Sequence, residues 1–268
     1  MSQQPSDRSG RSSLPTVAKV LLFAVLPILL AVVLVIVVLN AVLRPATSTN
    51  QQFDLDAGAG VAVDVGNATL DFAPSADDRV HVKVSGFSWG SDAPVTATDS
   101  GSITEISGGC RGGWFSFCRM SLEVALPADL PLEVRGVNGR IAVNNLTGDL
   151  VIQTSNGAVE VRNSVGTVDV RTSNGSITLE DSSSTDVETA TTNGQVELDF
   201  SSAPRTVEAS STNGAISILV PDDGTAYRID ADTVNGRVET GSVPTESDSV
   251  RSISARTTNG AVTIEVDD

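Results

Sequence analysis

The dipeptide Asn-Gly recurs seven times in the second half of this 268-residue chain. The pairs lie between Val137 and Asp268, and successive asparagines are 18, 18, 19, 20, 22 and 24 residues apart. A nearly constant period indicates an internal structural repeat, which restricts the chain to repeat architectures. The seven turn pairs are Asn138-Gly139, Asn156-Gly157, Asn174-Gly175, Asn193-Gly194, Asn213-Gly214, Asn235-Gly236 and Asn259-Gly260.

An alternating apolar segment follows each Asn-Gly pair, and a second one closes most repeats. Alternation of apolar and polar residues predicts half-buried β-strands, because successive strand side chains point to opposite faces. Each repeat therefore holds two strands and two turns. The apolar positions after the pairs are Ile141 and Val143, Val159 and Val161, Ile177 and Leu179, Val196 and Leu198, Ile216 and Ile218, Val238, and Val262, Ile264 and Val266. Those of the second strands are Leu150 and Ile152, Val168 and Val170, Val187, Val207, Ile229 and Ile253.

Two all-β arrangements fit this repeat. In an antiparallel meander, Asn-Gly would form a hairpin turn, because both residues accept positive φ, and Val170 would pair with Leu179. In a parallel β-solenoid, equivalent residues of successive repeats stack about 4.8 Å apart, and their side-chain amides form a ladder. The identity of residues one repeat apart favours the solenoid, since a meander gains nothing from it. We expect the Asn-Gly turns to supply positive φ at a corner.

A long apolar segment near the N-terminus predicts one transmembrane α-helix. Residues 1–19 are polar, whereas residues 20–43 are apolar except at Pro27 and Asn40. A helix of this length spans about 36 Å and exceeds a hydrocarbon core of roughly 30 Å. Three basic residues precede the segment, so we expect a cytoplasmic tail at 1–19 and an extracytoplasmic C-terminal domain. The alternative is a cleaved signal peptide, but the apolar run is longer than a usual signal-peptide core.

The region between the helix and the repeats has no regular period. Residues 44–52 are predicted to be a polar linker, and residues 53–136 an irregular N-terminal β region that leads into the solenoid at 137–268. Such an atypical region is what a solenoid needs to cover its open edge. At the other end, the acidic residues 265–268 are expected to blunt an exposed edge strand. The expected N-terminal strands are 61–65, 68–72, 80–84, 103–106, 121–126 and 132–134.

Two cysteines, Cys110 and Cys118, flank a glycine-rich loop. They lie on the side of the membrane where oxidation is permitted, so we expect a disulfide. Closing so short a loop is worth about 2.5 kcal/mol in the chain-entropy model. The chain has one histidine, His81, without ligand-like neighbours, so we expect an outward strand residue and no metal site.

Five aromatic residues gather around two loops of the N-terminal β region. Exposed rings in such loops would suit sugar stacking, a protein partner or the membrane interface. The alternative is a hydrophobic plug over the N-terminal end of the solenoid. These candidate binding residues are Phe87, Trp89, Trp114, Phe115 and Phe117.

The part of the chain beyond residue 44 is strongly acidic. It has 13 basic and 32 acidic residues, a net charge of −19. A surface of this charge repels nucleic acid, so we exclude a nucleic-acid partner. The carboxylates alternate singly with buried positions and are interpreted mainly as a solvated face. The later repeats contain extra residues at 221–225 and 244–249. These insertions indicate either a binding face or sequence drift in solvent-exposed loops without a function.

We expect no catalytic residues and no cofactor. No serine lies in a nucleophile-elbow pattern, no glycine-rich phosphate loop precedes a helix, and a Ser-His pair would have to use His81. A β-solenoid polysaccharide-active enzyme is the remaining enzymatic alternative, because carboxylates are plentiful.

Residues 122–127, Leu-Glu-Val-Ala-Leu-Pro, precede residues 132–139, Leu-Glu-Val-Arg-Gly-Val-Asn-Gly. Together with the repeated Thr-Ser-Asn-Gly and Thr-Thr-Asn-Gly, they resemble the bacterial putative-adhesin family of tandem short β-strand repeats. The resemblance covers residues 54–268 and implies an extracytoplasmic β-solenoid of a largely unknown function. It offers no catalytic residues, and the cysteines and aromatic loops are not part of its pattern.

The expected function is a membrane-anchored, non-catalytic module for cell-envelope interaction or adhesion. Its expected partners are the membrane and a cell-wall glycan or an envelope protein. The alternative is an accessory or sensor protein of an envelope-stress response, which some relatives in the resembled family suggest.

Overall fold

The computed structural model describes residues 25–42, 47–89, 94–110, 117–241 and 243–267. The chain divides into two compact units, Met1–Pro45 and Ala46–Asp268. Among the described residues of the first unit there is one helix of 17 residues, α2 (Leu26–Val42). The large apolar side chains of α2 up to Leu39 are 47–65% exposed.

The predicted transmembrane helix, 20–43, is described only in part. Residues 20–24 and 43 and the predicted cytoplasmic tail, 1–19, lie outside the described residues. In the part of the chain that the structure covers, no helix has both the length and the hydropathy needed to cross a membrane.

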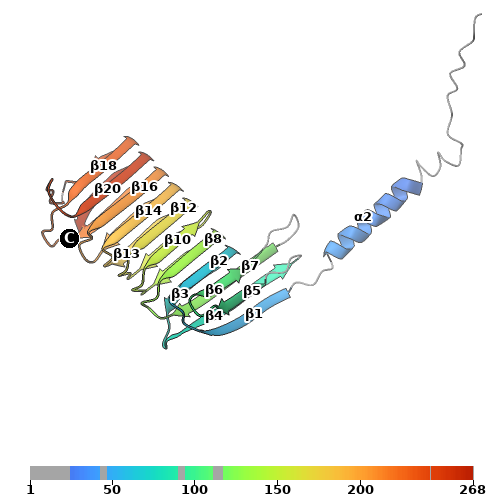
Figure 1. The fold of residues 1–268 in the computed structure, drawn as a ribbon. Coiled ribbons are helices and arrows are strands. Elements are labelled where there is room, and N and C mark those ends of the chain that lie inside the picture. Colours follow the sequence, from blue (N-terminus) through green and yellow to red (C-terminus); the bar gives the residue numbers. More distant parts are fainter. Residues whose placement is uncertain (1–24, 43–46, 90–93, 111–116, 242, 268) are drawn as a thin grey trace, which may run out of the picture. The chain divides into compact units, whose positions relative to one another are not determined.

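The second unit consists of two β-sheets. Sheet A has eleven strands, in the order β1 (Thr47–Asp56), β4 (Arg79–Trp89), β7 (Phe117–Leu126), β3 (Thr69–Pro74), β9 (Ile141–Asn144), β11 (Val159–Arg162), β13 (Ile177–Ser182), β15 (Val196–Phe200), β17 (Ile216–Pro221), β21 (Val262–Asp267) and β19 (Val238–Glu239). Sheet B has ten strands, in the order β18 (Arg228–Asn235), β20 (Ser252–Asn259), β16 (Thr206–Asn213), β14 (Asp186–Asn193), β12 (Val168–Asn174), β10 (Leu150–Thr154), β8 (Leu132–Asn138), β2 (Val61–Asn67), β6 (Thr104–Gly108) and β5 (Val95–Asp99). Figure 1 shows these strands lined up along one direction.

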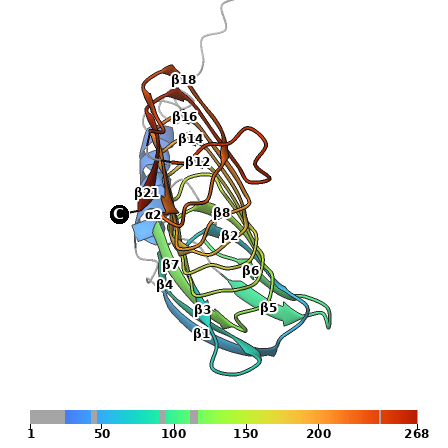
Figure 2. The same cartoon turned by 90° about the vertical axis from the view of Figure 1, so that its left-hand side faces the viewer.

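The repeats form a parallel solenoid, so that prediction is confirmed and the meander is wrong. Each Asn-Gly turn joins a strand of sheet B to a strand of sheet A, and strands of successive repeats pair in parallel. Val159 pairs with Ile177, which pairs with Val196, one repeat after another. Among the described strands, antiparallel pairing is confined to β1–β4, β4–β7 and β5–β6 at the N-terminal end. Figure 2 shows the successive coils overlying one another.

The core is a column of branched apolar side chains between the two sheets. Nearly all the predicted inward residues are buried, and each contributes roughly 1.5–3 kcal/mol before its ordering entropy is subtracted. The column ends in a layer of inward hydroxyls just before the Asn-Gly turns. These hydroxyls, which the sequence analysis did not single out, donate to glycine carbonyls of the adjacent coil over 2.9–3.3 Å. The donors are Thr172, Thr191, Ser211, Thr233 and Thr257.

The glycines of the Asn-Gly pairs are required for close approach rather than for positive φ. A Cβ on any of the seven would lie only 1.7–2.2 Å from a carbonyl oxygen of the adjacent coil. Only Gly139 and Gly260 among them have positive φ, so the prediction of positive φ at these corners is mostly wrong. Positive φ occurs instead in the turns at the opposite edge, at Asn145, Asn163 and Asp181.

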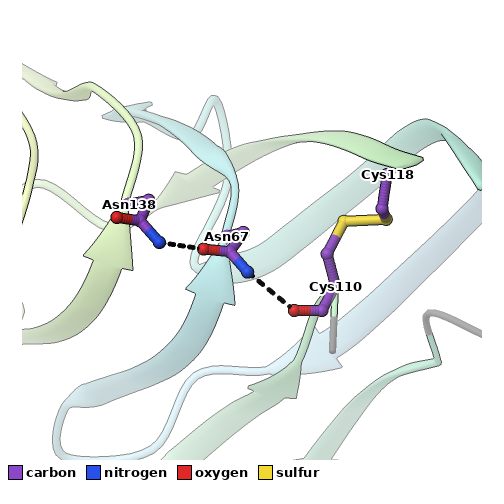
Figure 3. Close-up of a disulfide and its surroundings, with 4 residues drawn as sticks. All are labelled: Asn67, Cys110, Cys118 and Asn138. Carbon is purple, nitrogen blue, oxygen red and sulfur yellow. Dashed lines mark hydrogen bonds between the residues drawn. A yellow bond between two sulfur atoms is a disulfide. The ribbon is translucent and has the colours of Figure 1, made fainter. Parts of the chain in front are cut away.

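The asparagines of the turn pairs form the predicted ladder. The Nδ2 of each asparagine donates to the Oδ1 of the asparagine in the next coil toward the N-terminal end, mostly over 2.8–2.9 Å. Asn138 donates in the same way to Asn67, an eighth member that the Asn-Gly pattern missed because Ala68 follows it. Asn67 in turn donates to the backbone carbonyl of Cys110 over 3.0 Å (Figure 3). All eight side-chain amides therefore point the same way along the stack.

The chain does not place its coils in sequence order at either end of the stack. The coil β20–β21 lies between β16–β17 and β18–β19, and the coil β2–β3 lies between β6–β7 and β8–β9. After β17 the chain skips the adjacent place in the stack and forms β18–β19 one place further on. It then returns to fill the skipped place with β20–β21. The long connections 221–225 and 244–249 allow these two steps. β21 pairs with β17 along its whole length but with β19 only at Val262 and Thr263, so the expectation that residues 265–268 blunt an edge stays a prediction.

The N-terminal β region belongs to the same compact unit as the repeats. Its β2 and β3 pair in parallel with β8 and β9, so the solenoid begins well before residue 137. The predicted strands of this region are all present, and β1 and β5 were not predicted. The predicted linker, 44–52, is too long, because Thr47 to Gln52 pair with β4 as the first part of β1.

We predict that Gly194→Ala destabilises the unit by about 1–3 kcal/mol, because its Cβ would lie 1.9 Å from the Gly175 carbonyl oxygen. Gly241→Ala is the control, since a Cβ there meets nothing within 4 Å. Urea unfolding followed by circular dichroism measures both. Equal stability of the two variants would contradict the close-approach explanation.

A second prediction concerns the ladder. Asn174→Ala removes two hydrogen bonds, the one that Asn174 donates to Asn156 and the one that it accepts from Asn193. Asn235→Ala, at the end of the ladder, removes one hydrogen bond. At about 0.5–1.5 kcal/mol for each bond, the interior change should cost about twice as much as the terminal one. The same unfolding measurement tests this, and a larger loss for Asn235→Ala would refute it.

Candidate functional site

The predicted disulfide is present and closes the coil β6–β7. Cys110 follows β6 and Cys118 lies in β7, with their Cα atoms 5.8 Å apart. The bridge occupies the place in this coil that an Asn-Gly turn occupies in the repeats (Figure 3). Because the Cys110 carbonyl accepts the last bond of the asparagine ladder, the disulfide fixes the ladder's N-terminal end.

Three of the five predicted aromatic residues lie at the adjoining ends of two strands. Trp89 of β4 pairs with Phe117 of β7, and Phe87 pairs with Arg119. Phe87 is 49% exposed and Trp89 is half-buried, so Phe87 does not plug the solenoid. That role belongs to Phe53 and Leu55 of β1, which pack against the core. Trp114 and Phe115, the other two, lie outside the described residues, and the structure describes only the backbone of Phe117.

A concave surface of about 500 Å³ lies on the outer face of sheet A, over β1, β4, β7 and β3. It contains the only histidine of the chain and the only lysine beyond residue 44, two residues apart on β4. Lys83 Nζ lies 2.9 Å from Glu123 Oε2 of β7. Asp71 of β3 adds another carboxylate to the lining. We call this the concave charged site.

His81 is held between two carboxylates within this site. Its Nδ1 lies 2.6 Å from Asp54 Oδ1 of β1, and its Nε2 lies 2.8 Å from Asp77 Oδ1. The hydrogen bond to Asp54, then that to Asp77, raises the pKa of His81 above its usual 6.5. The hydrogen bond from His81 likewise lowers the pKa of Asp77. His81 is thus an outward strand residue, as predicted, and its two ring contacts clamp β1 to the turn that precedes β4.

The charged groups of the concave charged site are paired with one another. Each ring nitrogen of His81 is engaged by an aspartate, and Lys83 is paired with Glu123. Throughout the described ranges, no group of three or more histidine, cysteine or acidic side chains could hold a metal ion. This site was not predicted from the sequence, although the sole histidine and the only lysine beyond residue 44 lie two residues apart and were a usable signal.

The other end of the stack is open. The last coil consists of β18, with eight residues, and β19, with two. Beside them lies a second concave surface of about 470 Å³, lined by Tyr227, Ile229, Ala231, Val238 and Thr245 among others. We call this surface the open end.

Apolar side chains at the open end reach the solvent. Val234 is 72% exposed and Val238 is 40% exposed, although Val238 was predicted to be inward. Tyr227 is fully buried, and its hydroxyl has no partner among the described residues. Burial is the first cause that raises the pKa of Tyr227, to about 12. The two long connections converge here, where Tyr227 pairs with Thr245.

We predict that the pKa of His81, the single histidine signal in an NMR titration, lies above 6.5 and falls in Asp77→Asn. Asp222→Asn, a change in a connection at the open end, should leave it unchanged. Because the folded-state pKa is raised, the stabilisation by the clamp is full below pH 6.5 and is lost as the pH rises through the folded-state pKa. As the pH rises from 6.5 through the folded-state pKa of His81, the difference in unfolding free energy between the wild type and Asp77→Asn should therefore decrease. A pKa at or below 6.5 would disprove the clamp.

Comparison with known proteins supports the fold. The Toastrack DUF4097 family matches residues 132–268. No curated protein matches the chain. A putative adhesin from Bacteroides fragilis NCTC 9343 is 14% identical and has a TM-score of 0.52, and the alignment covers 82% of this chain and 97% of that one.

Two further solved structures are more distant. A putative cell adhesion protein from Clostridium sporogenes ATCC 15579 is 14% identical, with a TM-score of 0.40 and coverage of 82% of this chain and all of that one. A putative adhesin from Parabacteroides merdae ATCC 43184 is 10% identical, with a TM-score of 0.43 and coverage of 83% and 97%. The family match covers half of the chain, so this protein belongs to the Toastrack DUF4097 family, whose domain has no known function.

Proposed function

We propose that this protein is a membrane-anchored, non-catalytic interaction module of the cell envelope. Its solenoid binds an extended segment of an envelope protein at the open end. The observation that carries this proposal is the free edge of β18, which presents an incomplete coil with exposed apolar side chains.

The free edge can accept another strand. The backbone N–H of Arg228 donates to the Arg251 carbonyl over 2.9 Å, on the side of β20. Since backbone groups alternate in direction along a strand, the N–H groups of Ile229, Ala231 and Thr233 point to the free side. An edge of this kind pairs with an extended chain by β-augmentation.

Sheet A offers a second opening in the same coil. β19 has only two residues and pairs with Val262 and Thr263, the first two residues of β21, so β19 is much shorter than the strand beside it. A partner strand could therefore complete the coil in both sheets. The N-terminal end differs, because Phe53 and Leu55 of the edge strand β1 pack against the core there.

A polypeptide fits the open end better than a cell-wall glycan. A row of backbone donors and acceptors matches another strand, whereas sugars are usually held by exposed aromatic faces. The repeats from residue 137 onward contain two aromatic residues, Phe200 and Tyr227, and both are buried. The net charge of −19 beyond residue 44 favours a partner with basic flanking residues.

The sequence supports the membrane anchor. Residues 20–43 are apolar at all but two positions, and basic residues precede them. The exposed leucines and valines around α2 suit a lipid environment better than water. In this proposal the N-terminal tail is cytoplasmic and the solenoid is extracytoplasmic.

We predict that a photo-crosslinking amino acid in place of Val234 captures a discrete protein in intact cells. The same group in place of Ser173, an exposed residue in the middle of the stack, should not. Ala231→Pro removes a free-edge N–H without removing a β18–β20 bond, so it should reduce the Val234 adduct at least about ten-fold while the protein remains folded. An adduct sensitive to cell-wall hydrolases would instead identify a glycan, and no adduct at Val234 would disprove the proposal.

A further inference from the structure

We infer that the aromatic end of β4 contacts the lipid interface of the membrane in which the N-terminal segment is anchored. This inference rests on the proposed anchor and adds a surface of the solenoid unit to it. The surface comprises Phe87 and Trp89 of β4, Arg119 of β7, and the first residues of β1 beside them.

The chain connectivity keeps this surface near the bilayer. α2 ends at Val42 and β1 begins at Thr47, so four residues separate the two elements. Even when fully extended, that connection spans about 18 Å at most. Thr47 pairs with Ser88, and Ser48 pairs with Phe87. The point where the chain enters the solenoid therefore lies directly beside the exposed rings.

The side chains at this point suit the lipid interface. Phe87 is 49% exposed, and Trp89 lies two residues further along, on the same face of the strand. Arg119 is exposed and opposite Phe87 on the neighbouring strand. Aromatic rings are enriched where a protein meets lipid headgroups, and a guanidinium binds their phosphates.

The charge distribution along these three strands points the same way. The paired segments 47–52, 84–89 and 117–122 contain one charged residue, Arg119, and no carboxylate. The opposite ends of the same strands hold the concave charged site, with Asp54, His81 and Glu123. In a part of the chain with a net charge of −19, a carboxylate-free end beside the anchor permits close approach to anionic headgroups.

The inference commits to lipid because the bilayer is the apolar phase that the short connection keeps within reach. A protein partner on these rings would be an alternative occupant, and the experiment must separate the two. The chain offers a direct readout, since Trp89 and Trp114 are its only tryptophans.

The test uses the full-length Trp114→Phe chain in liposomes, which leaves Trp89 as the single fluorophore. Lipids brominated near the headgroup should quench Trp89 fluorescence at least about two-fold relative to unbrominated liposomes. The matched control is Trp89→Phe/Trp114→Phe/Val250→Trp, which places the fluorophore on an 89% exposed residue near the open end and should not be quenched. Quenching of Trp89 no greater than in this control overturns the inference.

Flotation of the same samples separates failure of the inference from failure of the anchor. Protein that floats with the liposomes while Trp89 remains unquenched contradicts lipid contact but leaves the anchor standing. Protein that stays at the bottom of the gradient contradicts the anchor itself. An additional Phe87→Ser change should reduce the quenching of Trp89 without changing flotation, and undiminished quenching would show that this surface does not hold Trp89 at the lipid.

Discussion

The whole β unit depends on one contact, the direct stacking of the backbone of each coil on the backbone of the next. Parallel pairing puts equivalent residues about 4.8 Å apart, so a side chain that fits one coil fits all of them. This spacing leaves no room for a Cβ at the glycine corners, where a carbonyl oxygen of the adjacent coil would be 1.7–2.2 Å away. It also brings the asparagine amides within 2.8–2.9 Å of each other for most of the stack. The valine core, the glycine corners and the amide ladder are therefore consequences of one repeat distance.

The two ends of the stack differ in how far the hydrophobic core of the last coil is covered. At the N-terminal end, antiparallel strands, the disulfide and the side chains of Phe53 and Leu55 cover the core. At the other end, β18 and the two-residue β19 leave apolar side chains and a row of backbone groups accessible. The covered end and the open end of the solenoid are about ten strand spacings apart, so the two surfaces can act independently.

The repeats were predictable because stacking leaves a periodic signal, with valine on valine and asparagine on asparagine. β1 was not, since Thr47 to Gln52 are polar and only pairing with β4 makes them a strand. The role of the glycines was misjudged because Asn-Gly also occurs in hairpins, and local sequence does not reveal a neighbouring carbonyl. The concave charged site depends on register, which brings Asp54 next to His81 across 27 residues of chain. The position of each coil in the stack could not be predicted either, because all the repeats share one sequence pattern.

The displaced order of the coils affects how the molecule is made. The coil β20–β21 leaves the ribosome after both of its neighbours, yet it lies between these two coils in the stack. Until it arrives, β16–β17 and β18–β19 cannot be neighbours, and each exposes an unsatisfied strand edge. The segment β20–β21 therefore joins two coils that precede it in the chain. A nascent chain that lacks it exposes unpaired strand edges on both coils, and such edges promote aggregation.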